Sequence, residues 1–244
     1  MKLPQTTKQV CNLAKAVGKF IAIEADKFSK GDIEIKGRNN FVTYVDKESE
    51  KRLIRELSKI IPDSGFIAEE DTVGHTIKEY TWIIDPLDGT TNYIHHLPVY
   101  SISIALMHNS EIILGVVYEI NNHECFYAYK DGGAFMNDTR INVSATSELV
   151  QAFLATGFPY YDYSRLDSYL QLFRASMEKT RGIRRLGSAA VDLAYVACGR
   201  FDGFFEYGLN SWDVAGGAFI VKEAGGTVSN FDNGPDFMLS LIHI

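Results

Sequence analysis

The chain has 244 residues, of which 46% are hydrophobic and 23% are charged, so it can bury a sizeable core as one large domain or two smaller lobes. Its net charge of −7 argues against a broad nucleic-acid-binding surface, which requires clustered lysine and arginine. No run of about 18 apolar residues is present to cross a membrane, and the N-terminal residues lack the apolar stretch of a signal peptide, so we expect a cytoplasmic protein without membrane contact.

Two amphipathic helices are predicted at the start of the chain. Apolar residues recur at helical spacing from Val10 to Ile21, which predicts a long helix that ends near residues 29–31. A second helix is predicted over residues 46–62, where Glu48 and Glu50 supply an acidic start that suits the positive end of the helix dipole.

Short β-rich segments follow these helices, separated by turn residues. They span residues 65–70, 81–85, 100–106, 111–120 and 123–129. We therefore expect residues 1–144 to form an N-terminal lobe in which a helix pair packs on an antiparallel sheet.

The remaining residues, 145–244, alternate between strand and helix patterns. Strands are predicted at 152–158 and 202–207, and helices at 164–179, 188–199 and 212–226. This alternation predicts a C-terminal α/β lobe, and the fold class as a whole is α+β or α/β. Since no long linker separates the lobes, we expect the active site in the cleft between them.

Acidic residues lie at the ends of two predicted strands and at the start of one predicted helix. Glu69 and Glu70 follow one strand, Asp85 and Asp88 flank a Pro-Leu turn after the next, and Asp213 opens a helix. Each pair alone is compatible with solvated surface carboxylates, and residues 82–92 alone with a strand and a tight turn. If the groups converge, however, only bound cations make the pocket tolerable, and oxygen ligands favour magnesium or manganese.

Two glycine-containing turns provide candidate phosphate-binding groups. Gly89, Thr90 and Thr91 offer backbone N–H groups and hydroxyls at a turn, and Gly187 with Ser188 opens a predicted helix. A metal pair about 3.5–4 Å apart stabilises both the attacking and the leaving oxygen in phosphoryl transfer, so the residues favour hydrolysis of a phosphate ester.

Cysteine and histidine contribute no predicted metal site. Cys11, Cys125 and Cys198 are far apart in the chain and are interpreted as core thiols. His95 and His96 are interpreted as structural, because sites built from oxygen ligands rarely use imidazole.

The segments WIIDPLDGTTN, GFIAEE and WDVAGG resemble the signatures of the inositol monophosphatase family, whose members are magnesium-dependent, lithium-sensitive phosphatases. The resemblance covers nearly the whole chain, because KGRNNFVTYVD, GGAFMN, RINVS and RRLGSAAVDLAYVACGRFDGFFEYGLNS match in order between and around these segments. It implies a layered αβαβα sandwich of the sugar-phosphatase type, with two lobes and the active site between them.

The resemblance also implies a role for each matching residue. The implied metal ligands are Glu69, Asp85, the Leu87 carbonyl, Asp88 and Asp213, which would hold two to three Mg²⁺ ions, with Mn²⁺ as an alternative. The implied catalytic residues are Glu69, Asp46 and Thr90, the last two orienting and helping to deprotonate the attacking water. The implied substrate-binding residues are Asp88, Gly89, Thr90, Gly187, Ser188, Ala189, Glu206 and Asp213, with Glu70 supporting the ligands from behind.

The function implied by the resemblance is hydrolysis of small phosphate monoesters, above all myo-inositol 1-phosphate to inositol and phosphate. Two alternatives stay open: a related sugar, histidinol or nucleotide phosphatase, and a regulatory partner of RNA polymerase or of ribosome assembly on the same scaffold. In the second alternative, the basic segment 181–185 would be the contact. The resemblance also implies a homodimer that acts on a small phosphorylated polyol or sugar.

The C-terminus departs from the family pattern. Family members continue after FDNGPDFM with another strand and a closing helix, whereas this chain stops at LSLIHI. We therefore expect a C-terminal lobe that is truncated at its end.

Overall fold

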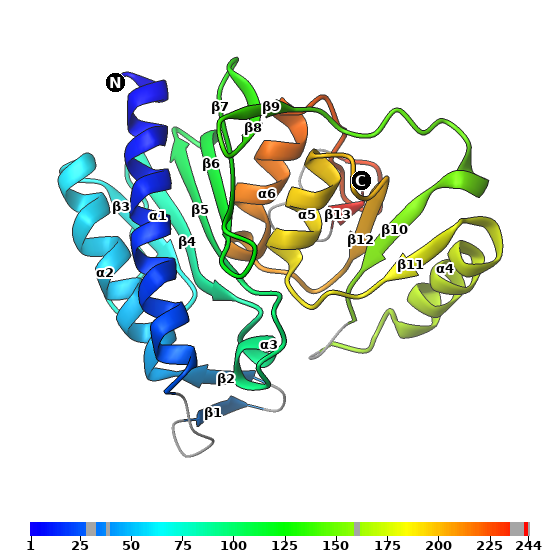
Figure 1. The fold of residues 1–244 in the computed structure, drawn as a ribbon, viewed down its shortest axis with the longest axis horizontal. Helices are drawn as coiled ribbons and strands as arrows, with labels where there is room; N and C mark the ends of the chain where they lie inside the picture. The colour runs from blue at the N-terminus through cyan, green and yellow to red at the C-terminus, as the bar shows by residue number, and fades with distance from the viewer. Residues whose placement is uncertain (28–32, 38–39, 159–161, 235–241, 244) are drawn as a thin grey trace.

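A computed structural model describes residues 1–27, 33–37, 40–158, 162–234 and 242–243. Helices and sheets alternate across the molecule in five layers, in the order α, β, α, β, α (Figure 1). This layered sandwich is the fold class that the sequence predicts.

The first layer consists of α1 (Leu3–Ala25) and α2 (Tyr44–Ile60), which pack against each other and against the large sheet. In α1, residues Val10, Ala14, Val17 and Ile21 are buried at helical spacing. Helix α2 begins at a capping box formed by Thr43 and Asp46, which satisfies two N–H groups at its N-terminus.

The second layer is a seven-stranded sheet with strand order β3 to β9. Its strands are β3 (Gly65–Ala68), β4 (Tyr80–Asp88), β5 (Ser101–His108), β6 (Glu111–Glu119), β7 (Glu124–Tyr129), β8 (Gly133–Met136) and β9 (Thr139–Ile141). All neighbouring pairs are antiparallel except β3 and β4, which are parallel. The expectation of a purely antiparallel sheet is therefore wrong at this edge.

The central helical layer consists of α5 (Ala189–Ala197), which is buried almost throughout, and α6 (Ser211–Glu223), which is buried from Val214 to Val221. Such helices carry apolar residues all around because they are covered on several faces. Their core also contains Val117, Phe126 and Ala128 from the large sheet. The division into lobes at residues 144 and 145 stays a prediction. The large sheet and the two central helices contribute to one hydrophobic cluster across this division.

The last two layers are a smaller sheet and one helix, α4 (Leu166–Lys179). The sheet has the order β11 (Gly182–Arg184), β10 (Phe153–Thr156), β12 (Gly203–Glu206) and β13 (Ile242–His243). Its first three strands are parallel, and β13 runs antiparallel to β12. Most of the LSLIHI segment lies outside the described residues, so the predicted truncation stays an expectation.

Several short elements escaped the sequence prediction. They are β1 (Ile33–Gly37), β2 (Asn40–Thr43), α3 (Thr90–Ile94), β8, β9, β11, β13 and the 3₁₀ helix η2 (Leu149–Gln151). Helix α1 ends at Ala25, earlier than predicted, and β4 continues through the Pro-Leu pair to Asp88. Among the described residues, no helix is both long and apolar enough to span a membrane.

Candidate active site

One cleft gathers residues from both sheets and from the central helices. Its walls are formed by the end of β4 and the start of α3, the segment 185–189 before and at the start of α5, the end of β12, and the start of α6. Eleven of the predicted site residues line it: Glu69, Asp85, Leu87, Asp88, Gly89, Thr90, Gly187, Ser188, Ala189, Glu206 and Asp213. Residues from widely separated parts of the sequence therefore meet at one place.

The end of β4 delivers two carboxylates to the cleft. An irregularity in its pairing with β5 lies between Asp85 and Asp88, where the strand passes through the Pro-Leu pair. Asp85 accepts the Leu87 N–H at 2.9 Å, which fixes the turn. Gly89 then adopts a φ of 96°, a conformation that favours glycine, and a Cβ there would lie 3.0 Å from the Val99 carbonyl oxygen.

Asp88 is held by the N-terminus of α5. Its Oδ2 atom accepts the Ser188 hydroxyl at 2.6 Å and the Ala190 N–H at 2.7 Å. Burial raises the pKa of Asp88 to about 6, against the lowering effect of these hydrogen bonds. Ser188 is also the N-cap of α5, since it accepts the Val191 N–H, so helix capping and orientation of Asp88 depend on one hydroxyl.

Asp46 lies directly behind Thr90. The Thr90 Oγ1 atom is 3.0 Å from Asp46 Oδ1 and 3.0 Å from the Leu87 carbonyl oxygen, so both acceptors compete for its single proton. The other oxygen of Asp46 accepts the N–H and the hydroxyl of Thr43. Burial raises the pKa of Asp46, which is only 1% exposed. Asp46 does not itself line the cleft but reaches it through Thr90.

The carboxylates of Glu69, Asp85 and Asp213 lie close enough in the cleft to repel one another. Burial is the main reason that the pKa values of Glu69 and Asp85 are raised well above their usual range, and the neighbouring carboxylates raise them further. Asp213, in the first turn of α6, accepts the Asn210 N–H at 2.6 Å, and burial raises its pKa to about 7. The cleft therefore concentrates negative charge that the protein alone does not neutralise.

Glu206 faces the cleft from the end of β12. It is 9% exposed, and burial and the charge of Asp213 raise its pKa to about 8. A Cβ built on Gly157 would lie 1.8 Å from Glu206 Oε2, so the absence of a side chain at Gly157 makes room for this carboxylate. The fully buried Asp192 lies in the same electrostatic environment, and its Oδ1 atom has no hydrogen-bond partner among the described residues.

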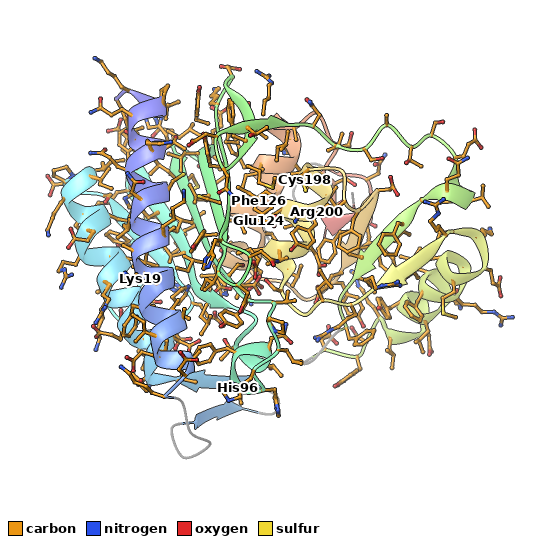
Figure 2. The ribbon with its side chains drawn as sticks, in the orientation of Figure 1. Lys19, His96, Glu124, Phe126, Cys198 and Arg200 are labelled. Atoms are coloured by element: carbon orange, nitrogen blue, oxygen red, sulfur yellow. The ribbon has the colours of Figure 1, made fainter. Side chains whose placement is uncertain are left out.

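Glu70 lies outside the cleft lining, behind Glu69. Its backbone N–H donates to Glu50 Oε2 at 2.8 Å, and its charge contributes to the raised pKa of Glu69. Glu50 itself is buried, whereas we expected it to be a charge at the helix start; the first-turn acid of α2 is Asp46. His96, just beyond α3, is exposed and does not line the cleft, and its structural role stays a prediction (Figure 2).

Three cleft features were missed at the sequence level. Arg185 lines the cleft with its guanidinium 5.5 Å from the centre of the Phe158 ring, and both side chains were assigned no role there. Asn92 donates to the carbonyl oxygens of Val99 and Leu186, at 2.7 and 2.8 Å, and so ties the start of α3 to the segments before β5 and before α5. The only available signal was the position of Arg185 and Asn92 beside the recognised motifs.

The donor set of the cleft fits a hard divalent cation. Glu69, Asp85, Asp88 and Asp213 offer oxygen atoms only, and their mutual repulsion is relieved when a cation lies between them. Within the described ranges, no three acidic, histidine or cysteine side chains are already arranged as a metal-binding group. The fit to a cation therefore rests on the oxygen donors and on their charge.

Comparison with known proteins identifies the family to which the chain is similar. The model of the Inositol monophosphatase family matches residues 2–243. The "Inositol-1-monophosphatase" of Mesorhizobium japonicum is 39% identical over 92% of this chain and 85% of that protein, and the "Nus factor SuhB" of Escherichia coli is 40% identical over 93% and 85%. The crystal structure of "extragenic suppressor protein suhB" from Bartonella henselae superimposes with a TM-score of 0.91 at 38% identity, covering 97% of this chain and 92% of that one.

Proposed function

The chain belongs to the inositol monophosphatase family, and on that premise we propose that it is a magnesium-dependent phosphatase of small monoesters whose first substrate to test is myo-inositol 1-phosphate. The observation that carries this proposal is the meeting of Glu69, Asp85, Asp88 and Asp213 beside the Gly89 turn in one cleft. A relative with 39% identity bears the name inositol-1-monophosphatase, which supports the choice of substrate.

The residues that would hold Mg²⁺, two to three ions or Mn²⁺ in its place, are Glu69, Asp85, the Leu87 carbonyl, Asp88 and Asp213. When bound, the ions supply charge neutralisation for the phosphate and activation of water. The bonds from Ser188 and Ala190 keep Asp88 in a fixed orientation at this wall of the cleft.

The Thr90–Asp46 pair provides a route for a proton. Thr90 Oγ1 lines the cleft, so it can accept a proton from the attacking water while its own proton passes to Asp46 Oδ1, 3.0 Å away. The raised pKa of Asp46 makes this carboxylate a better proton acceptor than an exposed aspartate. In this proposal Glu69 shares in orienting the water.

The phosphate is held by the backbone at Gly89 and Thr90. Their N–H groups lie at the start of α3, where N–H groups have no partners within the helix. Gly187, Ser188 and Ala189 line the opposite wall at the N-terminus of α5. At that wall the Ala189 and Ala190 N–H groups donate to Asp88, so the N–H donors for an anionic group come from the Gly89 turn.

The alcohol part of the substrate is bound at the other end of the cleft. Glu206 is the principal acceptor for its hydroxyl groups, with Ser188 and Ala189 beside it. The pKa of Glu206 is raised to about 8, and its carboxyl can form hydrogen bonds with hydroxyl groups whether it is neutral or charged. A hydroxyl-rich ligand is therefore favoured over a second anionic group.

A substrate panel tests this proposal. Phosphate release is measured from inositol 1-phosphate, fructose 1,6-bisphosphate, histidinol phosphate and adenosine 3′,5′-bisphosphate, each with Mg²⁺ and with a chelator. We expect the highest kcat/KM for inositol 1-phosphate and loss of activity with the chelator. Release that is independent of divalent cations would contradict the mechanism, and a preference for another member of the panel would replace the substrate.

A second candidate function is that of a regulatory partner of RNA polymerase or of ribosome assembly. It is favoured by the relative named Nus factor SuhB, at 40% identity. Purified RNA polymerase and ribosomal particles are offered to the parent and to an Asp88→Asn variant, and retention on both would support a role independent of catalysis. The predicted homodimer is tested in the same preparations by light scattering.

A further inference from the structure

A second groove lies at the far end of α5 from the cleft. Ser188 caps the helix in the cleft, whereas Gly199 and Arg200, just beyond its C-terminus, line this groove. A helix of nine residues separates the two sites by about 13 Å along its axis. The term "arginine groove" denotes here the surface formed by Arg181, Arg184, Arg200, Ser144, Thr146 and Asp202.

An aromatic floor supports two of the three arginines. The Arg184 guanidinium lies 4.9 Å from the Phe153 ring centre, and the Arg200 guanidinium lies 4.6 Å from that of Tyr195. Phe201 packs between these rings, at 5.2 Å from Phe153 and 6.0 Å from Tyr195. Stacking restricts each guanidinium before any ligand is bound, which lowers the entropy cost of binding.

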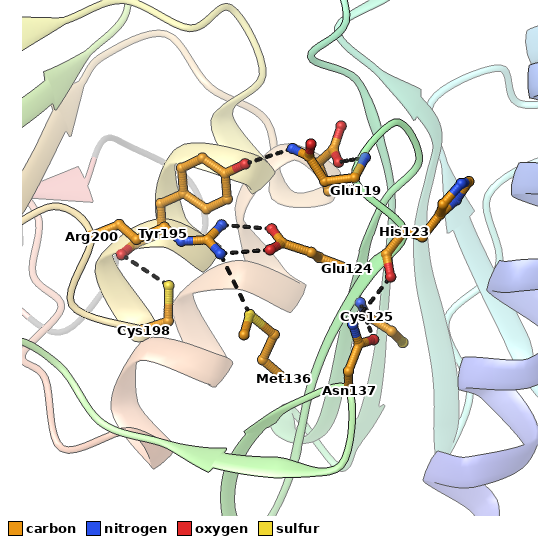
Figure 3. A network of polar contacts seen from close by, with 10 residues as sticks. Glu119, His123, Glu124, Cys125, Met136, Asn137, Tyr195, Cys198 and Arg200 are labelled. Carbon is orange, nitrogen blue, oxygen red and sulfur yellow. Dashed lines mark hydrogen bonds and ion pairs between the residues drawn. The ribbon is translucent and has the colours of Figure 1, made fainter.

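Arg200 is already engaged with a carboxylate. It donates from Nη1 and Nη2 to the two oxygens of Glu124, each at 2.5 Å. Figure 3 shows the two parallel contacts. This bidentate pair joins the end of α5 to β7 of the large sheet. Arg200 therefore provides a fixed wall of the groove rather than a free charge.

Within the described residues, Arg181 and Arg184 have no bidentate carboxylate partner, although the charge of Arg181 lowers the pKa of Asp202 in the same groove. Both side chains are exposed, and neither forms an ion pair with any acidic residue in the described part of the chain. The hydrogen bond of the Arg184 guanidinium goes to the carbonyl of its own neighbour, Ile183. Their N–H donors thus face the groove with unused capacity.

The one acidic residue among those that define the arginine groove, Asp202, is bonded to the protein backbone. Asp202 Oδ2 accepts the Phe153 N–H at 2.6 Å, and the hydroxyl groups of Ser144 and Thr146 contact the same carboxylate. Three arginines against Asp202 and Glu124 leave one surplus positive charge, in a chain whose net charge is −7. A concave cationic surface of this kind concentrates anions locally.

We propose that the arginine groove binds one phosphate group of a small ligand, either inorganic phosphate or a phosphate monoester, outside the active site. Arg181 and Arg184 bind its oxygens, since the guanidinium fork matches phosphate geometry. The hydroxyls of Ser144 and Thr146 line the same groove and hold Asp202 in place. The single surplus charge favours one discrete phosphate over a polyanion such as RNA, which needs a long basic track.

Calorimetric titration of the full chain tests this site. The chain is kept in chelator, so that the carboxylates of the cleft repel anions, and is titrated with inorganic phosphate, with inositol 1-phosphate and with a single-stranded RNA dodecamer. We expect one saturable site for phosphate or the monoester, and a Kd that is about tenfold higher in the double variant Arg181→Gln/Arg184→Gln. Arg174→Gln, on the exposed face of α4, is the matched control and should leave the Kd unchanged.

A charge-conserving double variant, Arg181→Lys/Arg184→Lys, keeps the test decisive if the glutamine variant fails to melt cooperatively. It should also weaken binding, because lysine cannot form the bidentate contact. Magnesium-dependent phosphatase activity should match the parent in both variants. The proposal is overturned by an absence of saturable binding to the parent, by equal Kd values in all variants, or by binding of RNA alone.

Discussion

The two ends of helix α5 face surfaces of opposite charge. At its N-terminus, Ser188 and Ala190 donate to Asp88 in a cleft lined by carboxylates, whereas at its C-terminus Arg200 pairs with Glu124 beside the arginine groove. Each side matches the helix dipole, since negative groups are stabilised at an N-terminus and positive groups at a C-terminus. One buried helix thus separates the carboxylate-lined cleft from the arginine groove.

The largest difference between the two ends should come from Asp88→Asn. Asparagine retains an oxygen to accept the bonds from Ser188 and Ala190 but loses the charge that a cation requires. We expect kcat/KM for inositol 1-phosphate to fall by about 10²–10³-fold in saturating Mg²⁺. Parental activity in a variant with an unchanged melting temperature would contradict the assigned site.

A second change at the cleft removes the proposed proton route. Thr90→Ala deletes the hydroxyl that lies 3.0 Å from Asp46 Oδ1, so kcat should fall by about a hundredfold while KM changes little. Thr90→Ser keeps the hydroxyl and serves as the control. If serine and alanine at this position reduce kcat equally, the hydroxyl has no role in proton transfer.

The acidic cleft should also make stability depend on pH when cations are chelated. The folded-state pKa values of Asp88, Asp213 and Glu206 are raised to about 6, 7 and 8, so between about pH 4 and 8 the folded chain binds more protons than the unfolded chain. The free energy of unfolding therefore falls as pH rises through this window, by at most about 1.4 kcal/mol per pH unit for each group.

Urea unfolding at several pH values measures this dependence, and Mg²⁺ added at pH 8 should restore part of the loss. Asp213→Asn should flatten the curve because it removes one of the repelling charges. A chelated chain that gains stability between pH 5 and 8 would show that these carboxylates are not the destabilising groups.

The cap of α5 should have a smaller effect. Ser188→Ala removes the hydroxyl that accepts the Val191 N–H and donates to Asp88, which should cost about 1 kcal/mol and lower the melting temperature by about 2–4 °C. Ser188→Thr keeps the hydroxyl and should melt close to the parent. Equal melting temperatures for alanine and serine would mean that the cap does not stabilise the helix.

The smallest effect is expected at the other end of α5. Glu124→Gln breaks a bidentate pair whose arginine side chain is 40% exposed, so solvent screening limits the loss to about 0.5–1 kcal/mol. Phosphatase activity should be unchanged. A loss of activity comparable to that of the cleft variants would show that the two ends of the helix are functionally coupled.

The sequence alone allowed most long elements and most of the cleft to be predicted. Helical periodicity identified α1 and α2, and the family resemblance pointed to Asp85, Asp88 and Asp213. Short strands such as β8 and β9 were missed because three or four residues carry too little periodicity to distinguish a strand from a loop. The parallel pairing of β3 and β4 was missed because pairing direction depends on the chain path between the strands.

What the sequence determined by itself is local: the buried faces of α1 and α2, the turn after Asp85, and the cap at Ser188, each of which depends on residues a few positions apart. Tertiary structure alone decided that Glu50 is buried and that the acidic groups from β4, β12 and α6 share one cleft. It also decided that Arg184 and Arg200 stack on a common aromatic floor. Burial and charge interactions depend on distances in space between segments that are far apart in the chain, and only packing sets those distances.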